Sequence, residues 1–386
     1  MSRILICVPA YEPSMIYGGP TAVAADHARW LTQRGHSVTV LTTNLTSLNP
    51  ARRHDLTRVE KDGVEIHYLP AYVPAYFAFP HFSAVVAPSL GSWLQRELHR
   101  FDVVHIHFAR ELFQIGCAAG ARRAGKPYVL QTHGTLHRTG LQHKAIDLVF
   151  ARKALRNAAA VIALQSVEEG QLRAIEPACT IERIANGIEI PSGGPLWTRD
   201  RLAAPKVVFL ARLHPVKRLL DLVEAAAILA RRGIRPHYEI IGPDRGDLAP
   251  AQQRIAEAGL QDSFEFTGEL ARDATMPRLR DAAIHAQPSI WECFSMTTIE
   301  ALSFGVPCVV TTGNELWREL RDAGAALVTE PGAEAFAAGL EKMLNNPELA
   351  ADISARGHGW VTRTCARDVV VQRLEEIYQR AQASRR

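Results

Sequence analysis

The chain has 386 residues, of which 47% are hydrophobic and 22% are charged, and its formal net charge is +4. This length exceeds what one hydrophobic core usually organises, so we expect two domains. The composition excludes an intrinsically disordered chain, and a mean hydropathy near zero excludes a protein made of membrane-spanning helices.

The basic excess lies in the first half of the chain. Residues 1–190 carry 20 Lys and Arg against 15 Asp and Glu, whereas residues 191–386 carry 24 against 25. One segment supplies most of this surplus, since only Asp147 interrupts its basic residues Arg138, Lys144, Arg152, Lys153 and Arg156. This segment is a candidate surface for anionic lipid or phosphate, and the alternative is a solvated helix face.

The first apolar run, Ile4–Val8, is stopped by Pro9 and is too short for a signal-peptide core or a membrane span. We therefore expect a cytoplasmic protein. Its six cysteines show no C-x-x-C spacing, so they predict neither a disulfide framework nor a zinc site.

Short β-rich apolar runs alternate with helical periodicity along nearly the whole chain, which predicts βα units and parallel sheets. Thr21–Arg34 has a helical pattern that ends at Gly35. Six strands are expected in the first half: Ile4–Val8, Ser37–Leu41, Val64–Tyr68, Val103–Ile106, Tyr128–Gln131 and Val161–Leu164.

The periodicity breaks at residues 186–205, where Gly and Pro cluster, and this segment is the best candidate for a linker. The alternation then restarts, which predicts a second doubly wound domain. Its expected strands are Val207–Leu210, Tyr238–Ile241, Phe264–Thr267, His285–Pro288 and Pro307–Val310. Ligands bind at the carboxyl ends of such strands, so two facing sheets would hold a ligand in the cleft between them.

Gly18 and Gly19 precede a predicted helix, where the backbone can approach an anionic ligand closely. An ordinary turn is the alternative. The pattern G-x-G-x-x-G is absent after the first strand, and the second strand ends without a carboxylate, which disfavours a dinucleotide-binding domain. The absence of G-x-x-x-x-G-K-[ST] disfavours a P-loop NTPase.

In the second half, the strand Val207–Leu210 leads into a basic loop that contains Arg212 and Lys217, followed by a helix from about Leu219. A planar Arg fork, a Lys and a helix N-terminus in one loop suit a diphosphate. A solvated basic loop is the alternative.

The segment Glu292–Glu300 follows the strand His285–Pro288 and enters a helix that continues to Ser303. If this helix begins near Ser295, Glu300 lies roughly 7 Å along it. Glu292 could then accept hydrogen bonds from sugar hydroxyls and Glu300 could hold a cis-diol, with the first amides of the helix between them. Each glutamate alone could equally be an ordinary surface residue.

These motifs together, in this order, resemble the retaining glycosyltransferases of family 4, which have the GT-B fold. The resemblance covers nearly the full length. Its shorter phrases are Gly35–Val40, Thr132–Thr135, Asn186–Glu189 and Phe266–Glu269.

The resemblance implies an acceptor-binding Rossmann-like domain at residues 1–190 and a nucleotide-sugar-binding domain at 191–366. Residues 367–386 would form a helix that returns to the first domain. The two α/β domains would face each other across a cleft.

The resemblance also assigns roles. Arg212 and Lys217 would hold the diphosphate, and Glu300 would hold the ribose. His133 would lie beside the sugar near the reacting carbon. The remaining donor-binding positions are Gly18 and Gly19 near the phosphate, Phe266 and Gly268 near the base, and Glu292, Phe294, Ser295, Met296 and Thr297 at the transferred sugar.

Three positions depart from the family pattern: Cys293 and Ser295 stand where glycines are usual, and Glu189 stands where Asp is commoner. Bulkier side chains at 293 and 295 could narrow the sugar pocket. The donor sugar is therefore open.

No Asp-x-Asp occurs in the chain, which fits a metal-independent transfer, and no cofactor and no metal site are expected. The expected partners are a nucleotide-diphosphate sugar, a glycan or lipid-linked acceptor of cell-surface polysaccharide or lipopolysaccharide synthesis, and an anionic membrane surface, with no nucleic acid. A sugar-nucleotide epimerase of the same fold and a non-catalytic nucleotide-sugar-binding protein are the alternatives.

Overall fold

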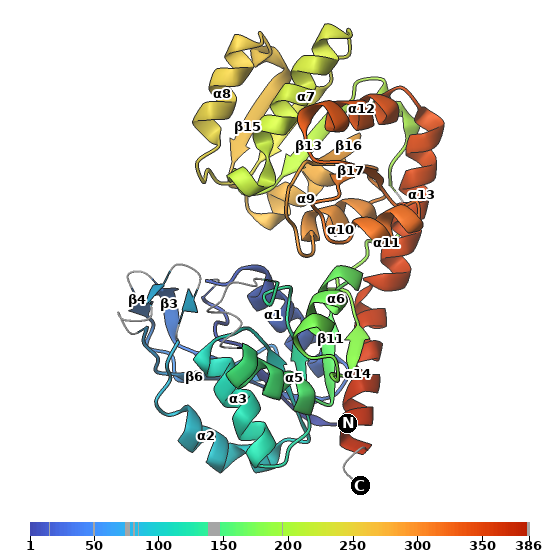
Figure 1. Ribbon diagram of the computed structural model, residues 1–386. Helices are drawn as coiled ribbons and strands as arrows, with labels where there is room; N and C mark the ends of the chain where they lie inside the picture. The colour runs from blue at the N-terminus through green and yellow to red at the C-terminus, as the bar shows by residue number, and fades with distance from the viewer. Residues whose placement is uncertain are drawn as a thin grey trace. The chain divides into compact units, whose positions relative to one another are not determined.

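The computed structural model describes residues 1–386 except 15, 49–50, 74–77, 80–81, 84, 138–146, 195 and 384–386. The chain divides into two compact units (Figure 1). Unit 1 comprises Met1–Gly187 and Arg367–Arg386, and unit 2 comprises Ile188–Ala366. Each unit is built on its own largely parallel sheet, which confirms the predicted α/β class.

Unit 1 has an eight-stranded sheet in the order β12-β11-β10-β9-β1-β2-β6-β5. Only β5 is antiparallel to its neighbour. Its strands are β1 (Arg3–Cys7), β2 (Ser37–Thr43), β5 (Arg58–Lys61), β6 (Val64–Leu69), β9 (Val103–His107), β10 (Tyr128–Gln131), β11 (Ala160–Ala163) and β12 (Ile181–Arg183). Two small hairpins, β3 (Leu45–Leu48) with β4 (Ala51–Arg53) and β7 (Ala78–Phe79) with β8 (Phe82–Ser83), lie outside this sheet.

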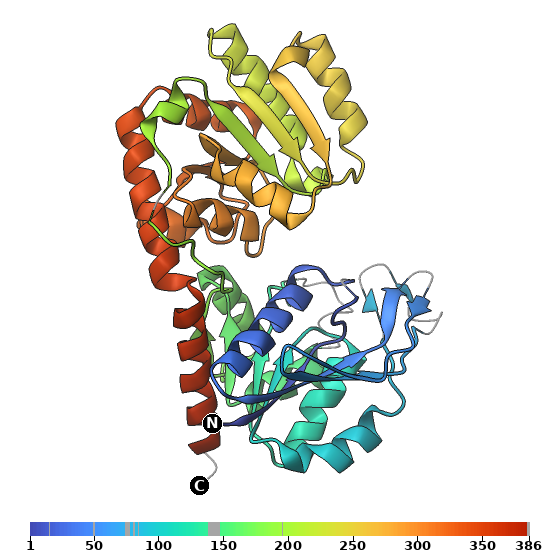
Figure 2. The ribbon, with the colours of Figure 1, turned by 180° about the vertical axis from the view of Figure 1, so that it is seen from behind.

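Helices cover both faces of the unit 1 sheet. The helices are α1 (Gly19–Gln33), α2 (Leu90–Glu97), α3 (Leu112–Arg123), α5 (Arg152–Asn157), α6 (Ser166–Ile175) and α14 (Arg367–Ala383). Helices α2, α3 and α5 lie on one face, and α1 and α14 lie on the other (Figure 2). All five residues of β9 are buried, as expected for a central strand that is covered on both faces.

Unit 2 has a six-stranded, fully parallel sheet in the order β15-β14-β13-β16-β17-β18. Its strands are β13 (Lys206–Leu210), β14 (His237–Ile241), β15 (Phe264–Gly268), β16 (Ile284–Gln287), β17 (Cys308–Thr311) and β18 (Leu327–Thr329). Its helices are α7 (Leu219–Arg231), α8 (Leu248–Glu257), α9 (Arg272–Arg280), α10 (Met296–Ser303), α11 (Trp317–Asp322), α12 (Ala333–Leu344) and α13 (Pro347–Thr364).

The predicted strands agree with the observed ones to within two residues at each end. The strands β12 and β18, which have three residues each, and the antiparallel edge strand β5 were not predicted from the sequence. These elements lie at sheet edges, where a short strand needs little apolar sequence. The cysteines are buried except for Cys293, which is partly exposed.

Candidate functional site

The strand order of unit 2 locates its functional edge. From β13 the chain builds β14 and β15 on one side, and it then returns to build β16, β17 and β18 on the other. The order therefore reverses between β13 and β16, and ligands of doubly wound sheets bind outside the carboxyl ends of the strands at such a point. The two loops that the sequence singled out follow these two strands.

The loop after β13 presents its two cations differently. Arg212 is exposed, and within the described part of the chain it forms no ion pair. His214 caps a short 3-10 turn by accepting a hydrogen bond from the amide of Val216 at its Nδ1, 3.2 Å away. Lys217 ends this turn with its side chain only 12% exposed. The turn therefore directs Lys217 inward.

Lys217 Nζ donates to Glu292 Oε1, and the Glu292 side chain is 16% exposed. The backbone joins the same two loops, since the amide of Ile290 donates to the carbonyl of Val216 at 3.0 Å. The predicted diphosphate-binding Lys and sugar-binding Glu are thus in direct contact.

The backbone of Glu292 is also fixed by the loop after β17. Its amide donates to Gly313 O at 2.9 Å, and its carbonyl accepts from the Glu315 amide at 2.8 Å. A Cβ at Gly313 would overlap the carbonyl of Ser289, so only glycine lets the two loops approach this closely. Glu292 is therefore held from two sides before any ligand arrives.

A buried amide completes this arrangement. Gln287, the last residue of β16, is 2% exposed, and its Nε2 donates to Glu292 Oε1 at 3.2 Å and to Ser295 Oγ. Its Oε1 accepts from Thr298 Oγ1 at 2.8 Å and from Asn314 Nδ2 at 3.0 Å. Gln287 and Asn314 were not predicted as site residues from the sequence. The available signal was a polar residue that ends a buried strand.

The helix α10 begins beside Glu292. Ser295 is its N-cap, and the hydroxyl of this residue accepts from the amide of Thr298 at 3.3 Å. The amides of Met296 and Thr297 belong to the first turn, where no preceding helical carbonyl is available to them. Phe294 is buried just before the cap. This end of the helix carries the partial positive charge of the helix dipole.

Glu300 is buried on α10 and accepts a hydrogen bond from Arg272 Nη1, at the start of α9. Arg272 itself is largely exposed. Phe266 and Gly268 lie in β15, where Phe266 is partly buried and Gly268 is exposed with a left-handed φ of 70°. The structure thus places Glu292 beside the N-terminus of α10. It places Glu300 on this helix, where its carboxylate is bonded to Arg272.

The predicted site residues of unit 1 also follow strands. Gly18 and Gly19 lie at the N-terminus of α1, after the loop from β1. His133 follows β10 with a left-handed φ of 51°, and its Nε2 shares a hydrogen bond of 2.8 Å with His107 Nδ1. Burial and, to a smaller extent, the nearby His27 lower the pKa of His133 to about 3, so its imidazole is neutral.

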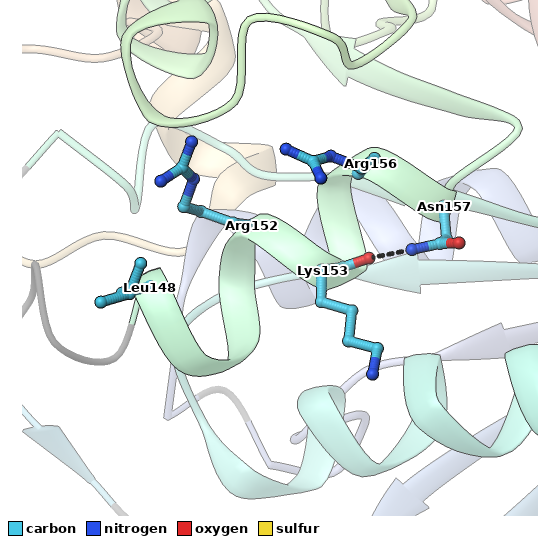
Figure 3. A pocket seen from close by; sticks show the side chains of 5 residues that line it. All are labelled: Leu148, Arg152, Lys153, Arg156 and Asn157. Atoms are coloured by element: carbon cyan, nitrogen blue, oxygen red, sulfur yellow. Dashed lines mark hydrogen bonds between the residues drawn. The ribbon is translucent and has the colours of Figure 1, made fainter.

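The basic segment is described from Asp147 onward, so Arg138 and Lys144 lie outside the described residues. Asp147 pairs with Arg110. A surface pocket of about 420 Å³ is lined by Leu148, Arg152, Lys153, Arg156 and Asn157 (Figure 3).

The charge of this pocket is partly balanced. Arg152 and Arg156 both pair with Glu176, at 3.6 and 2.9 Å, whereas Lys153 points away from them (Figure 3). Leu148 and Phe150, on the π-helical turn Asp147–Ala151, are 67% and 44% exposed. Leu148 therefore adds an exposed apolar side chain to the basic lining of this pocket. Among the described residues, no helix is both long and apolar enough to span a membrane.

Two family models match the chain, one in each unit. The glycosyl transferase 4-like domain matches residues 18–187, and the glycosyl transferases group 1 model matches residues 200–360. Together they cover most of the sequence, and each falls almost entirely within one unit.

Individual proteins agree with these families. EpsF of Bacillus subtilis, named as a glycosyltransferase, is 30% identical over 59% of this chain, but the match spans only 61% of EpsF. The D-inositol 3-phosphate glycosyltransferase of Acidothermus cellulolyticus is 26% identical over 96% of this chain and 87% of its own length. Anabaena HepE, solved in complex with UDP, superposes with a TM-score of 0.75 at 17% identity, covering 98% of this chain and 99% of HepE.

Proposed function

Since this chain belongs to the group 1 glycosyl transferases and has the GT-B fold of two Rossmann-like domains, we propose that it transfers a sugar from a nucleotide-diphosphate sugar to a glycan or lipid-linked acceptor. The donor would bind in unit 2 and the acceptor in unit 1. The observation that carries the donor proposal is the Lys217–Glu292 pair at the switch point of unit 2, beside the N-terminus of α10.

The diphosphate would be held by cations and backbone amides. A diphosphate that approaches Lys217 competes with Glu292 for the same ammonium group. Once Lys217 turns to the phosphates, Glu292 Oε1 keeps its hydrogen bond from Gln287 and is free to accept one from a sugar hydroxyl. Arg212, exposed in the same loop, would add a planar fork of donors to the phosphates.

The nucleoside would lie along α10 and β15. Glu300 accepts from Arg272 with one oxygen, and as a carboxylate it has further lone pairs for the two hydroxyls of a ribose. Phe266 and Gly268 would border the base. Glu300 would therefore read the nucleoside, whereas Glu292 would read the sugar.

The transfer itself would retain the anomeric configuration, with the acceptor hydroxyl attacking from the face that the diphosphate leaves. Lys217, Arg212 and the amides of Met296 and Thr297 would stabilise the charge that develops on the leaving diphosphate, an electrostatic role. Gly18 and Gly19 would approach the donor phosphate, and His133 would lie near the reacting carbon. No cofactor and no metal are predicted for this step.

The acceptor is proposed to be presented at an anionic membrane surface on the cytoplasmic side, in the synthesis of polysaccharide or lipopolysaccharide. The support is the surface formed by Leu148, Arg152, Lys153 and Arg156, which combines an exposed apolar side chain with basic ones. Basic side chains are attracted to anionic headgroups, and apolar ones enter the acyl boundary.

A transfer assay tests this function. The full-length protein is incubated with labelled nucleotide sugars and lipid extracts, and the anomeric configuration of the product is read by NMR. Transfer with retention is expected. Conversion of the donor without an acceptor would instead indicate an epimerase, and donor binding with no conversion in any mixture would indicate a binding protein.

A further inference from the structure

Unit 1 contains a cluster of three buried histidines that the proposed transfer does not use. His27 lies on α1, and His105 and His107 lie on β9, with exposed fractions of 1%, 0% and 2%. Residues i and i+2 of a strand point to the same face, so both β9 imidazoles project on one side of the sheet. This is the face that α1 covers (Figure 2). Residues far apart in sequence thus bring three imidazoles together.

Within the part of the chain that the structure describes, four buried ring nitrogens of these imidazoles have no hydrogen-bond partner: His27 Nδ1, His27 Nε2, His105 Nε2 and His107 Nε2. A buried polar atom that lacks a partner costs about 1–3 kcal/mol, and proteins rarely leave several of them together. Ordinary packing therefore does not account for the cluster. A missing ligand for these nitrogens would account for it.

The three rings lie close together and are stacked, with 21° between the planes of His105 and His107 and 27° between those of His27 and His105. One ring nitrogen from each of the three histidines lies within 4.8 Å of the other two. A tetrahedral zinc site has Zn–N bonds of about 2.0–2.1 Å, which places its nitrogens about 3.4 Å apart. Binding would therefore have to draw the rings together and turn them out of this stacked arrangement, so that their lone pairs converge on one cation.

The Nδ1 atoms of His105 and His107 on β9 already take part in hydrogen bonds. His105 Nδ1 shares a hydrogen bond of 2.7 Å with Tyr378 Oη on α14, and His107 Nδ1 shares one of 2.8 Å with His133 Nε2. Metal-bound histidines nearly always donate their second N–H to such a partner, which leaves the lone pair of the other nitrogen for the metal. A proton on each Nδ1 would direct both Nε2 lone pairs into the cluster.

The three imidazoles indicate which kind of cation would bind. Each of the three histidines can offer the lone pair of one ring nitrogen to a ligand. Neutral imidazoles suit zinc and similar divalent transition metals, whereas magnesium and calcium prefer oxygen ligands. The first-choice ligand is therefore a borderline-soft divalent cation.

We propose that His27, His105 and His107 bind one divalent transition-metal cation of the zinc type, with water in the fourth position. The cation lies between α1 and β9 and stabilises the fold of unit 1. It is separate from the donor residues on unit 2, and its existence does not depend on the proposed transfer.

Cobalt binding tests the site directly. The full-length protein is stripped with a chelator, and Co²⁺ is added while the visible d–d absorption of tetrahedral cobalt is recorded. The wild type is expected to bind one Co²⁺ per chain, which Zn²⁺ displaces. His27→Gln should lose this absorption, whereas His237→Gln, at a partly exposed histidine of unit 2 paired with Glu265, should keep it.

Tyr378→Phe provides a second variant that keeps the packing of α14 and removes only the hydroxyl bonded to His105. Its Zn²⁺ affinity should fall about tenfold or more, as for other outer partners of metal ligands. Zn²⁺ should raise the melting temperature of the wild type, because a ligand that binds the native state stabilises it. Stripped wild type that binds no Co²⁺ or Zn²⁺ would overturn the proposal. So would thiolate-to-cobalt charge-transfer bands, which would assign the metal to cysteine.

Discussion

Two polar clusters lie in the two units, and they differ in how completely their hydrogen bonds are satisfied. In unit 2, the Gln287 amide is bonded at both its oxygen and its nitrogen, and Glu292 is held by Lys217. In unit 1, His27 has no hydrogen-bond partner among the described residues at either ring nitrogen, and His105 and His107 each lack one at Nε2.

The two clusters represent two ways in which a protein can prepare a binding site. A saturated network fixes its geometry before the ligand arrives, so the ligand meets side chains that are already oriented. An unsaturated buried cluster has an unfavourable energy until something binds it. We therefore expect changes in unit 2 to act on donor turnover and changes at the histidines to act on cation binding.

The largest expected effect is at Lys217, whose ammonium group pairs with Glu292. Lys217→Ala removes the charge that would stabilise the leaving diphosphate. The turnover number should fall about 100- to 1,000-fold, as on loss of other preorganised charge-stabilising groups. Steady-state kinetics with saturating donor measures it.

Lys342→Ala is the matched control, since Lys342 is exposed on α12 of the same unit. It should leave the turnover number unchanged. Near-normal turnover by Lys217→Ala, with circular dichroism showing a folded protein, would remove the assigned role of this residue.

The next effect is at Glu300, whose carboxylate is bonded to Arg272. Glu300→Gln weakens hydrogen bonds of a ribose to a charged acceptor, which contribute about 1.5–3 kcal/mol each. The KM for the donor should rise about tenfold or more while the turnover number changes little. Glu341→Gln, which alters an exposed ion pair with Arg232, is the control and should leave the KM unchanged. A fall in turnover with constant KM would contradict a ribose-holding role.

A smaller effect is expected when a hydrogen-bonding group is removed from the network around Gln287 in unit 2. Gln287→Leu leaves the side chains of Thr298 and Asn314 buried without their acceptor. The free energy of unfolding should fall by about 1–3 kcal/mol. Gln253→Leu, at an exposed position on α8, should change it by less than about 0.5 kcal/mol. Urea unfolding compares the two variants, and equal stabilities would mean that the network contributes nothing.

The smallest effect concerns the basic surface of unit 1. Glu176 pairs with Arg152 and Arg156, whereas among the described residues no carboxylate pairs with Lys153. Lys153→Ala should therefore lower binding to anionic vesicles about fivefold, since one Lys near such a surface contributes about 1 kcal/mol. Flotation at low and high salt measures it, with Lys342→Ala as the control. Wild-type protein that never floats with anionic vesicles would contradict the membrane proposal.

The fold followed closely from the sequence because strongly buried strands leave a clear pattern. Tyr128–Gln131 was predicted with its observed bounds, and α7 begins at the predicted Leu219. The strand β12 at the sheet edge was missed because it is short and only partly buried. Burial on two faces produces the apolar runs that make a strand visible in a sequence.

The sequence predicted residues that form the site, but it did not predict the contacts between them. Glu292 and Lys217 were singled out separately, but their direct pairing depends on two loops that meet only in the folded sheet. The role of Gln287 depends in the same way on Asn314, which comes from a third loop. Long-range contacts of this kind leave no local pattern.

The histidine cluster shows the same limit. His105 and His107 share a strand face by their spacing, which the sequence displays. His27 joins them only because α1 packs on that face. A spacing search for metal ligands therefore finds two of the three.

A thermal-shift panel with UDP-, GDP-, ADP- and dTDP-sugars on the wild type and on Lys217→Ala tests most directly whether the donor binds at the Lys217–Glu292 pair. A bound ligand raises the melting temperature by mass action. We expect at least one donor to raise the melting temperature of the wild type, and we expect this rise to be lost or strongly reduced in Lys217→Ala. No shift with any donor in the wild type, or the same shift in both proteins, would contradict a donor site at the Lys217–Glu292 pair.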